Sequence, residues 1–431
     1  MEKKRHAWLP DFGVQGWCVT LAAFCFYFCG NIFDGALNAV LNVYNLTYGW
    51  STVQMTSAVT LGGWLSILGI VIFGAVCKKK GAKFTSVIGL FGAAIFICLV
   101  AMAQNYMMFA IGTVGFIFFC TGFMVIGVGQ FGANWFPRKT GMYMGLATCG
   151  MTASAASLNY VIIKVTENFG VSAFMYGVAV ACVIVAVLVL AFIHNYPEEV
   201  GCYPDNDKTF SREAYEKEKA ALEELKKSSP YTMSKVLRTK ETWMVALGWS
   251  LPMLVATGSI GQLALTFVEF GHDFMFGIMI LTTAWPVGII GNYLCGVIDD
   301  KWGTKIASII VVAAELLGIL IILFAGSNAN AAVLGAGLLL FAMSGCSNIT
   351  VSMSTTVFGR VDFENFWPVI SVVYKFLIAS SPLLVAAIAA AANYHMVLSV
   401  LAAICVVAIV IMALTTGKCI TGDKTMDKKL Y

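Results

Sequence analysis

Long apolar segments follow one another along the whole chain and are separated by short polar segments. Most are about 20 residues long or longer, the length that an α-helix needs to cross the hydrocarbon core of a bilayer. A backbone that faces lipid must satisfy its own hydrogen bonds, so these segments are expected to be helices. The predicted fold class is an all-α integral membrane protein with twelve spans, numbered 1–12, at residues 16–40, 53–76, 84–103, 107–131, 141–163, 172–195, 243–267, 275–298, 306–326, 331–357, 367–391 and 395–416.

Basic residues alternate between the two sides of these spans. All but two of the 27 Lys and Arg residues lie in the termini or in every second loop; the exceptions are Lys164, in a loop on the other side, and Lys375, inside span 11. Cytoplasmic loops of membrane proteins carry the excess of Lys and Arg. We therefore expect both termini in the cytoplasm and a location in the plasma membrane.

Composition excludes several classes of protein. Hydrophobic residues make up 59% of the chain and charged residues 12%, against about 25% charged in soluble domains. The sequence has no GxxxxGK[ST] or HExxH motif, and its 13 cysteines show neither CxxC nor Cys/His metal spacing, so we interpret them as packing residues. We expect no enzyme activity, no cofactor, no metal and no nucleic-acid partner. The first apolar run lacks a small-residue cleavage site, so no cleaved signal peptide is expected.

One long polar stretch, residues 196–241, separates two groups of six spans. Within it, residues 211–228 favour a short surface helix, with Ser211 as a cap and Glu213–Lys217 and Glu223–Lys227 as i,i+4 pairs. The stretch is either a solvated linker or a regulatory segment that binds a partner. The predicted organisation is therefore a six-helix bundle at 1–195, a cytoplasmic linker at 196–241 and a second six-helix bundle at 242–431.

The two groups of spans resemble each other at a fixed offset of 222 residues. The loop after span 2 runs from Gly74 to Lys83 with Gly81 inside it, and the loop after span 8 runs from Gly296 to Lys305 with Gly303 at the matching place. A duplicated unit of spans is typical of secondary transporters.

The loop after span 8, Gly296-Val-Ile-Asp-Asp-Lys-Trp-Gly-Thr-Lys305, resembles the loop motif of the major facilitator superfamily. In that family the motif runs Gly, three residues, Asp, a basic residue, one residue, Gly, one residue and a basic residue. The resemblance implies a gating loop whose residues are Gly296, Asp300, Lys301, Gly303 and Lys305. After span 2 the motif is degenerate, with Lys78 at the acidic position.

Two shorter stretches resemble the oxalate/formate antiporter branch of that superfamily. They are Asn134-Trp-Phe-Pro-Arg-Lys-Thr-Gly141 and Gly170-Val-Ser-Ala-Phe-Met-Tyr-Gly177. This branch, which includes monocarboxylate porters, carries a functional lysine in span 11. Its oxalate transporter uses an additional basic residue in span 8, and span 8 of this chain has none before its cytoplasmic end. A single cation suits a monocarboxylate better than a dicarboxylate.

Three charged residues lie well inside predicted spans: Asp34, Glu315 and Lys375. A charge at mid-bilayer costs at least about 2.5–3.5 kcal/mol, so each is a candidate functional residue. Lys375 would attract an anionic substrate, or else form a structural ion pair. Asp34 would carry a coupling proton or contact substrate, or else neutralise Lys375 when the site is empty. Glu315 is expected to serve helix packing.

Polar and aromatic side chains near these charges complete the predicted substrate site. Asn31, Asp34 and Asn38 share one helical face by their spacing. The further candidates are Tyr374, Trp285, Gln262 and Asn348. Other aromatic residues are expected to face lipid or its interface.

The sequence thus predicts a secondary active transporter that moves a small organic anion, most simply a monocarboxylate, by alternating access. It would be monomeric and would work as an antiporter with a counter-anion or as a proton symporter. The alternative is an efflux transporter for amphipathic compounds or drugs.

Overall fold

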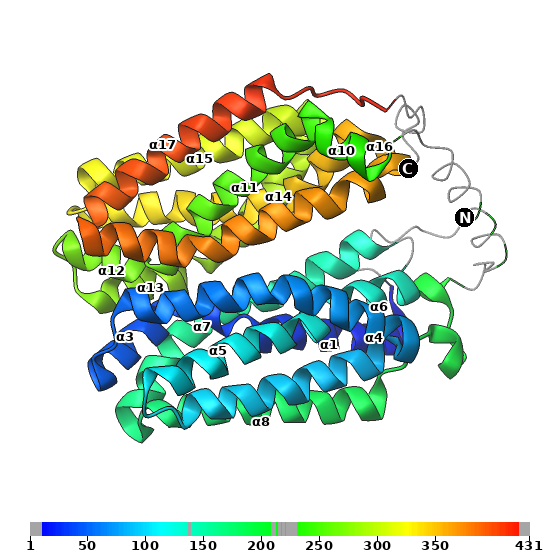
Figure 1. Ribbon diagram of the computed structural model, residues 1–431, viewed down its shortest axis with the longest axis horizontal. Coiled ribbons are helices and arrows are strands. Elements are labelled where there is room, and N and C mark those ends of the chain that lie inside the picture. Colours follow the sequence, from blue (N-terminus) through cyan, green and yellow to red (C-terminus); the bar gives the residue numbers. More distant parts are fainter. Residues whose placement is uncertain are drawn as a thin grey trace, which may run out of the picture. The chain divides into compact units, whose positions relative to one another are not determined.

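The computed structural model describes residues 11–136, 139–207, 213, 217, 220 and 231–421, and these residues form helices and connecting turns without a β-strand (Figure 1). All but three residues of the surface helix expected at 211–228 lie outside this part of the chain. The elements of the N-terminal half are α1 (Gly13–Gly30), α2 (Ile32–Gly35), α3 (Leu37–Tyr48), α4 (Thr52–Ala101), α5 (Tyr106–Cys120), a π-helical turn (Thr121–Gly127), α6 (Val128–Trp135), α7 (Thr140–Phe169), α8 (Val171–Phe192) and two 3₁₀ turns (Pro197–Val200 and Pro204–Asn206).

From residue 231 onwards the elements are α10 (Met233–Arg238), α11 (Lys240–Gly261), α12 (Leu263–Glu269), α13 (Phe274–Thr283), α14 (Trp285–Trp302), α15 (Thr304–Ala325), α16 (Ala329–Ala391) and α17 (Tyr394–Leu414). Asparagine side chains cap several of these helices. Asn105 accepts the backbone N–H of Met108 at the start of α5, and Asn393 accepts that of Met396 at the start of α17. Each predicted span overlaps a described helix.

Ten helices of the described chain are long and apolar enough to cross a membrane, two fewer than the predicted spans. Helix α4, with 50 residues, contains spans 2 and 3 joined at Gly81. Span 8 is divided at Ala284 between α13 and α14. Span 1 was expected to be one helix over 16–40, and this is wrong, because it is interrupted at Asn31 and again at Ala36. Span 7 is likewise interrupted, at Gln262.

The duplicated loops turn the chain in the same way. Gly81 has φ 86° and ψ 169°, and Gly303 has φ 86° and ψ 154°. This region of backbone space is essentially restricted to glycine. The offset of 222 residues therefore relates two corners of the same backbone conformation, and α16 turns similarly at Gly359, with φ 68° and ψ 175°.

The chain forms two compact units. Unit 1 comprises Met1–Phe33, Leu65–Ser154 and Val165–Arg212, and unit 2 comprises Asp34–Trp64, Ala155–Lys164 and Glu213–Tyr431. Parts of spans 1, 2 and 5 thus pack with the C-terminal spans. The division at 1–195, 196–241 and 242–431 describes the duplication of the chain rather than these packing units, and it stays a prediction.

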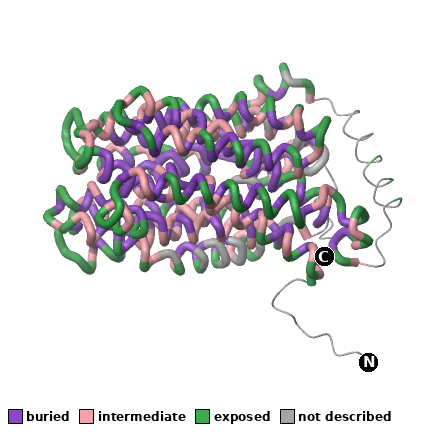
Figure 2. Tube along the Cα trace, turned by 90° about the horizontal axis from the view of Figure 1, so that it is seen from below, coloured by how far each residue is buried: buried purple, intermediate pink, exposed green. Residues whose placement is uncertain are grey.

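Each unit has its own apolar core, with buried positions along the inward sides of its helices (Figure 2). In unit 2, α11, α15, α16 and α17 pack against one another around Trp249, Phe358 and Phe366. In unit 1, α1 packs against α8 and α6, with the rings of Phe26 and Phe123 in edge-to-face contact and their centroids 5.7 Å apart.

One end of unit 2 carries the loops 49–51, 271–273, 326–328 and 392–393. We call it the outer end, because the charge pattern predicts that it faces away from the cytoplasm.

Candidate functional site

Asp34 lies in the single turn of α2, between the two interruptions of span 1. Its flanking residues Ile32, Phe33 and Ala36 are buried, whereas Asp34 itself is exposed. A carboxylate in the middle of an apolar span cannot face lipid without a large cost. The surface that Asp34 faces must therefore be open to water.

Lys375 lies in the part of α16 that corresponds to span 11, and its side chain is half-buried. Its charge and that of Asp34 interact electrostatically, and both residues belong to unit 2. The structure thus brings together the two candidate charges, which are more than 300 positions apart in sequence. Water partly screens this attraction, because Asp34 faces a surface that is open to water, but the apolar spans around the pair keep the screening below that of bulk water.

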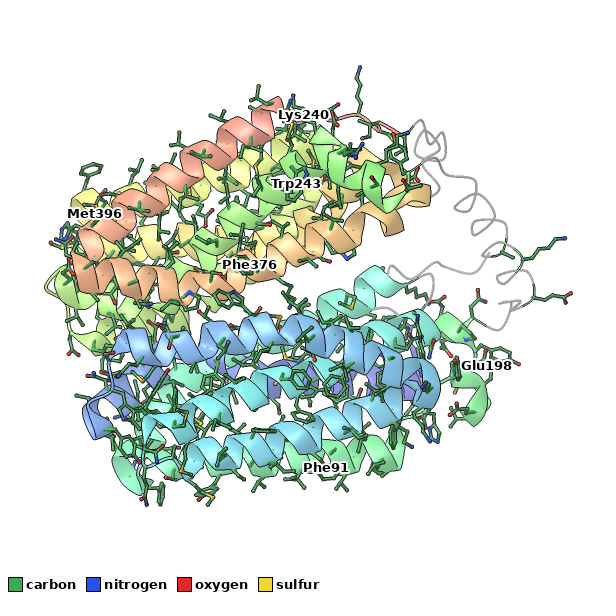
Figure 3. The ribbon with its side chains drawn as sticks, viewed as in Figure 1. Phe91, Glu198, Lys240, Trp243, Phe376 and Met396 are labelled. Carbon is green, nitrogen blue, oxygen red and sulfur yellow. The ribbon has the colours of Figure 1, made fainter. Side chains whose placement is uncertain are left out.

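Phe376, the residue after Lys375 in α16, stacks on an aromatic residue of another helix. Phe376, labelled in Figure 3, and Trp64 of α4 are stacked with ring centroids 5.2 Å apart and an interplanar angle of 10°. The indole Nε1–H of Trp64 donates to Ser380 Oγ at 3.1 Å. Gly63 allows this contact, because a Cβ there would overlap Ala379. The sequence analysis missed Trp64 and Phe376, since aromatic residues in spans mostly face lipid.

Asn38 is buried, and its amide contacts the backbone of span 7. Its Nδ2 donates to the carbonyl of Ile260 at 2.9 Å, and its Oδ1 accepts the N–H of Ala264 at 3.1 Å. Asn31 belongs to unit 1, where its Nδ2 donates to the carbonyl of Met151 at 3.1 Å. The Oδ1 of Asn31 is buried and has no hydrogen-bond partner within the described part of the chain.

Asn159 of α7 makes the corresponding contact with span 1. Its Nδ2 donates to the carbonyl of Gly35 at 2.6 Å, and its Oδ1 accepts the N–H of Ala39 at 3.2 Å. The two amides therefore account for the interruption of span 1 at Ala36 and that of span 7 at Gln262, where a helix would otherwise pair these same backbone groups. In the sequence, Asn38 and Asn159 are visible only as polar residues in apolar spans, and this pattern does not reveal which backbone groups they bind.

Gln262 is fully buried at the interruption of span 7. Its Nε2 donates to the carbonyl of Pro382 at 2.9 Å, and its Oε1 accepts the hydroxyl of Tyr394 at 2.9 Å. Both amide atoms of Gln262 are thus occupied within unit 2. Tyr374 is half-buried and packs against the apolar core of that unit.

The remaining candidates fall into two groups. Trp285 begins α14 and Asn348 lies within α16, but their side chains are outside the described part of the structure. Glu315 is fully buried in α15, and neither oxygen of its carboxyl group has a hydrogen-bond partner within the described part of the chain. This position agrees with the expected packing role of Glu315.

The expected gating loop joins α14 to α15. Lys301 is exposed, Gly303 makes the left-handed corner, and Lys305 Nζ donates to the carbonyl of Ala413 at 2.7 Å, near the end of α17. An ammonium at a helix C-terminus is favourable there. The surroundings of Gly296 and the side chain of Asp300 lie outside the described part. At the matching corner in unit 1, Asn195 Oδ1 accepts the backbone N–H of Lys83 at 2.9 Å.

The sequence matches the family model of the Major Facilitator Superfamily over residues 19–365. The chain belongs to this superfamily. It is therefore a multi-pass membrane protein of a transporter superfamily rather than an enzyme, and the predicted superfamily is confirmed.

Two individual proteins are similar to this chain. The sialic acid transporter NanX of Escherichia coli (strain K12) is 26% identical over 190 residues, which cover 42% of this chain and 46% of that protein. The chain thus aligns with less than half the length of this relative. A crystal structure of a bacterial homolog of the human lysosomal transporter Spinster, in an inward-facing and occupied conformation, is 12% identical with a TM-score of 0.69. That match covers 92% of this chain and 96% of the other and establishes the likeness of fold.

Proposed function

We propose that this protein transports a small organic anion across the membrane by alternating access, with Lys375 as the residue that attracts the anion. The single observation that carries the proposal is the electrostatic pair of Lys375 and the exposed carboxylate of Asp34 inside apolar spans. Charges in such places are costly and are retained for function.

A monocarboxylate is the substrate class that this charge balance favours. Among the described spans, the cation paired with Asp34 is Lys375, and span 8 contributes no Lys or Arg before its cytoplasmic end. The relative that is a sialic acid transporter is, by its name, a carrier of an organic acid. The resemblance to the oxalate/formate antiporter branch supports the same class, although it rests on two short stretches.

Asp34 serves as the exchangeable counter-ion in this mechanism. When no substrate is bound, its carboxylate neutralises Lys375 and lowers the cost of keeping a half-buried ammonium inside an apolar span. An incoming carboxylate competes with Asp34 for the same ammonium. Asp34 is then either released to solvent or neutralised by a proton, which corresponds to antiport or to proton symport.

The location follows from the same reasoning about charge. Lysines and arginines gather at the termini and at every second loop, so we propose that these parts face the cytoplasm and that the membrane is the plasma membrane. We propose a monomer, since one chain already contains both six-span halves between which a transporter of this kind forms its substrate site.

The test is substrate counterflow in proteoliposomes, with a panel of monocarboxylates and dicarboxylates at two pH values. We expect Lys375→Ala to reduce saturable monocarboxylate exchange at least tenfold and Lys375→Arg to retain part of it, because charge is kept but geometry changes. Asp34→Asn removes the competing carboxylate, so we expect a lower apparent KM together with slower exchange. Lys240→Ala, an exposed lysine at the start of α11, is the matched control and should exchange normally.

Saturable dicarboxylate exchange that is unaffected by Lys375→Ala would overturn the substrate assignment.

An efflux transporter for amphipathic compounds is the second candidate. The exposed aromatic stack of Trp64 and Phe376 favours it, because it offers an apolar surface beside a charge. Export of a lipophilic cation that survives Lys375→Ala and is lost in Phe376→Ala would support this alternative.

A further inference from the structure

The amide of Asn38 takes the place of one hydrogen bond in another helix. In a continuous helix the N–H of each residue pairs with the carbonyl four positions earlier, so the N–H of Ala264 would pair with the carbonyl of Ile260. Instead, Asn38 donates to that carbonyl at 2.9 Å and accepts that N–H at 3.1 Å. The side chain thus separates the two groups and satisfies both, and α11 ends at Gly261 while α12 begins at Leu263.

This contact joins the two halves of the duplicated chain. Asn38 lies in span 1, before the linker, and Ile260 and Ala264 lie in span 7, after it, although all three belong to unit 2. The amide of Asn159 is inserted into span 1 in the same way, but spans 1 and 5 belong to the same half. When the two halves of a transporter separate at the outer end, the contact of Asn38 with span 7 has to break, whereas the contact of Asn159 with span 1 does not.

Span 7 has two ways of satisfying its backbone. With Asn38 inserted, it is broken at Gln262; with Asn38 withdrawn, Ala264 and Ile260 can pair directly and the helix becomes continuous. In either arrangement the N–H of Ala264 and the carbonyl of Ile260 keep a partner, and this matters because an orphaned buried donor or acceptor is costly. Leu37, the neighbour of Asn38, also packs near Gly261, so withdrawal frees that position of the helix as well.

We propose that Asn38 is a removable latch of the outer end, which switches span 7 between a broken and a continuous helix as the transporter changes its access. The latch holds the outer parts of spans 1 and 7 together when inserted and lets them separate when withdrawn. It acts on the access equilibrium of the empty protein, so it does not depend on which substrate is carried.

The test measures the distance between two exposed positions at the outer end, Leu46 of α3 and Asp273 before α13. Spin labels attached to azide-bearing noncanonical residues at these positions avoid the native cysteines, and the distance distribution is recorded without substrate in nanodiscs. We expect Asn38→Ala to raise the ratio of the long-distance to the short-distance population about tenfold or more, since two hydrogen bonds across the contact are lost. Asn42→Ala, the same change one turn along α3, is the matched control.

A second variant tests the other state. Ala264→Pro removes the N–H that a continuous span 7 needs, and its ring would clash with the carbonyl of Ile260, while a proline near the start of α12 is tolerated. The change also removes the bond from the N–H of Ala264 to Asn38 Oδ1, but the bond from Asn38 to Ile260 remains and the continuous helix is excluded. We therefore expect the short distance to persist and transport to be lost. Asn159→Ala should lower the melting temperature without changing the distance ratio.

An unchanged distance distribution in Asn38→Ala, in protein that melts cooperatively, would overturn the latch. Normal transport by Ala264→Pro would overturn the switch of span 7. Loss of carboxylate transport with intact latch behaviour would count against the proposed function alone, so the two proposals fail separately.

Discussion

At the scale of single residues, glycine conformation separates positions that otherwise look alike. Gly303 and Gly337 both have open space around the place where a Cβ would go, but only Gly303 has a positive φ, of +86°. Its ψ of 154° places it in a region that side-chain-bearing residues almost never occupy.

We predict that Gly303→Ala lowers the free energy of unfolding by about 1–3 kcal/mol. Gly337→Ala, inside α16, should instead be neutral or raise it by about 0.5–1 kcal/mol, because alanine loses less backbone entropy in a helix. Thermal unfolding of both variants in the same detergent measures the contrast. Equal destabilisation by the two changes would show that the corner at Gly303 carries no conformational demand.

The candidate site residues differed in how far the sequence could predict their surroundings. Lys375 and Asp34 were found because charges are rare in apolar spans, and the structure brings their charges together. Asn38 was assigned to the substrate, yet in this structure both of its amide atoms bind the backbone of span 7. A polar residue in a span indicates that it has a partner, but the register of two helices 222 positions apart decides which one it is.

At the scale of elements, the start of α17 is held by a carboxylate from another helix. Glu269, the last residue of α12 and beyond the predicted end of span 7, accepts the backbone N–H of Tyr394 at 2.8 Å and is 2.9 Å from Nδ1 of His395. Burial raises the pKa of Glu269, but the hydrogen bonds from Tyr394 and His395 outweigh this effect and hold the pKa below its ordinary value. An anion at a helix N-terminus is also favourable.

This lowered pKa predicts how stability depends on pH. The contribution of Glu269 is fully present above its unfolded pKa of about 4.3 and is lost as pH falls through the lower folded pKa. We therefore expect the melting temperature of the native protein to exceed that of Glu269→Gln at pH 7, and the difference to shrink towards pH 3. Asp273→Asn, an acid at the start of α13 whose side chain caps nothing, is the control. A difference that stays constant with pH would contradict the assignment.

Whole elements were largely predictable, and their interruptions were not. The apolar runs placed every span to within a few residues at most ends, because length and hydropathy determine where a helix crosses a membrane. The interruptions at Ala36 and Gln262 have no proline as their cause. They arise where Asn159 and Asn38 insert their amides, so they depend on tertiary packing that no local pattern contains.

At the scale of the whole molecule, small residues allow the two halves of the duplicated chain to meet. Gly63 in span 2 lies against Ala379 in span 11 so closely that a Cβ would overlap it, and both are in unit 2. We predict that Gly63→Ala slows exchange several-fold, because spans 2 and 11 can no longer pack closely. Gly63→Ala combined with Ala379→Gly should restore most of the rate, since the exchanged methyl groups leave the total volume unchanged.

Counterflow of the two single variants and the double variant gives a complete cycle. Ala379→Gly alone is expected to exchange at nearly the normal rate. Purely additive effects, with no recovery in the double variant, would show that this close contact does not limit the transport cycle.

The duplicated organisation was visible in the sequence, but the packing of the segments was not. Motif spacing related Gly81 to Gly303, and their backbone angles agree closely. The sequence alone could not show that residues 34–64 and 155–164 pack with the C-terminal spans, because that packing depends on contacts between segments far apart in the chain.

The latch at position 38 also limits which side chain can stand there. The site needs one donor towards Ile260 and one acceptor towards Ala264, an arrangement that a primary amide supplies at every pH. A carboxylic acid of the same shape supplies it only while protonated, because its ionised form has two acceptors and repels a carbonyl. Asn38→Asp, which exchanges one NH₂ group for OH, would therefore turn a latch that closes at every pH into one that closes at acidic pH and opens at neutral pH.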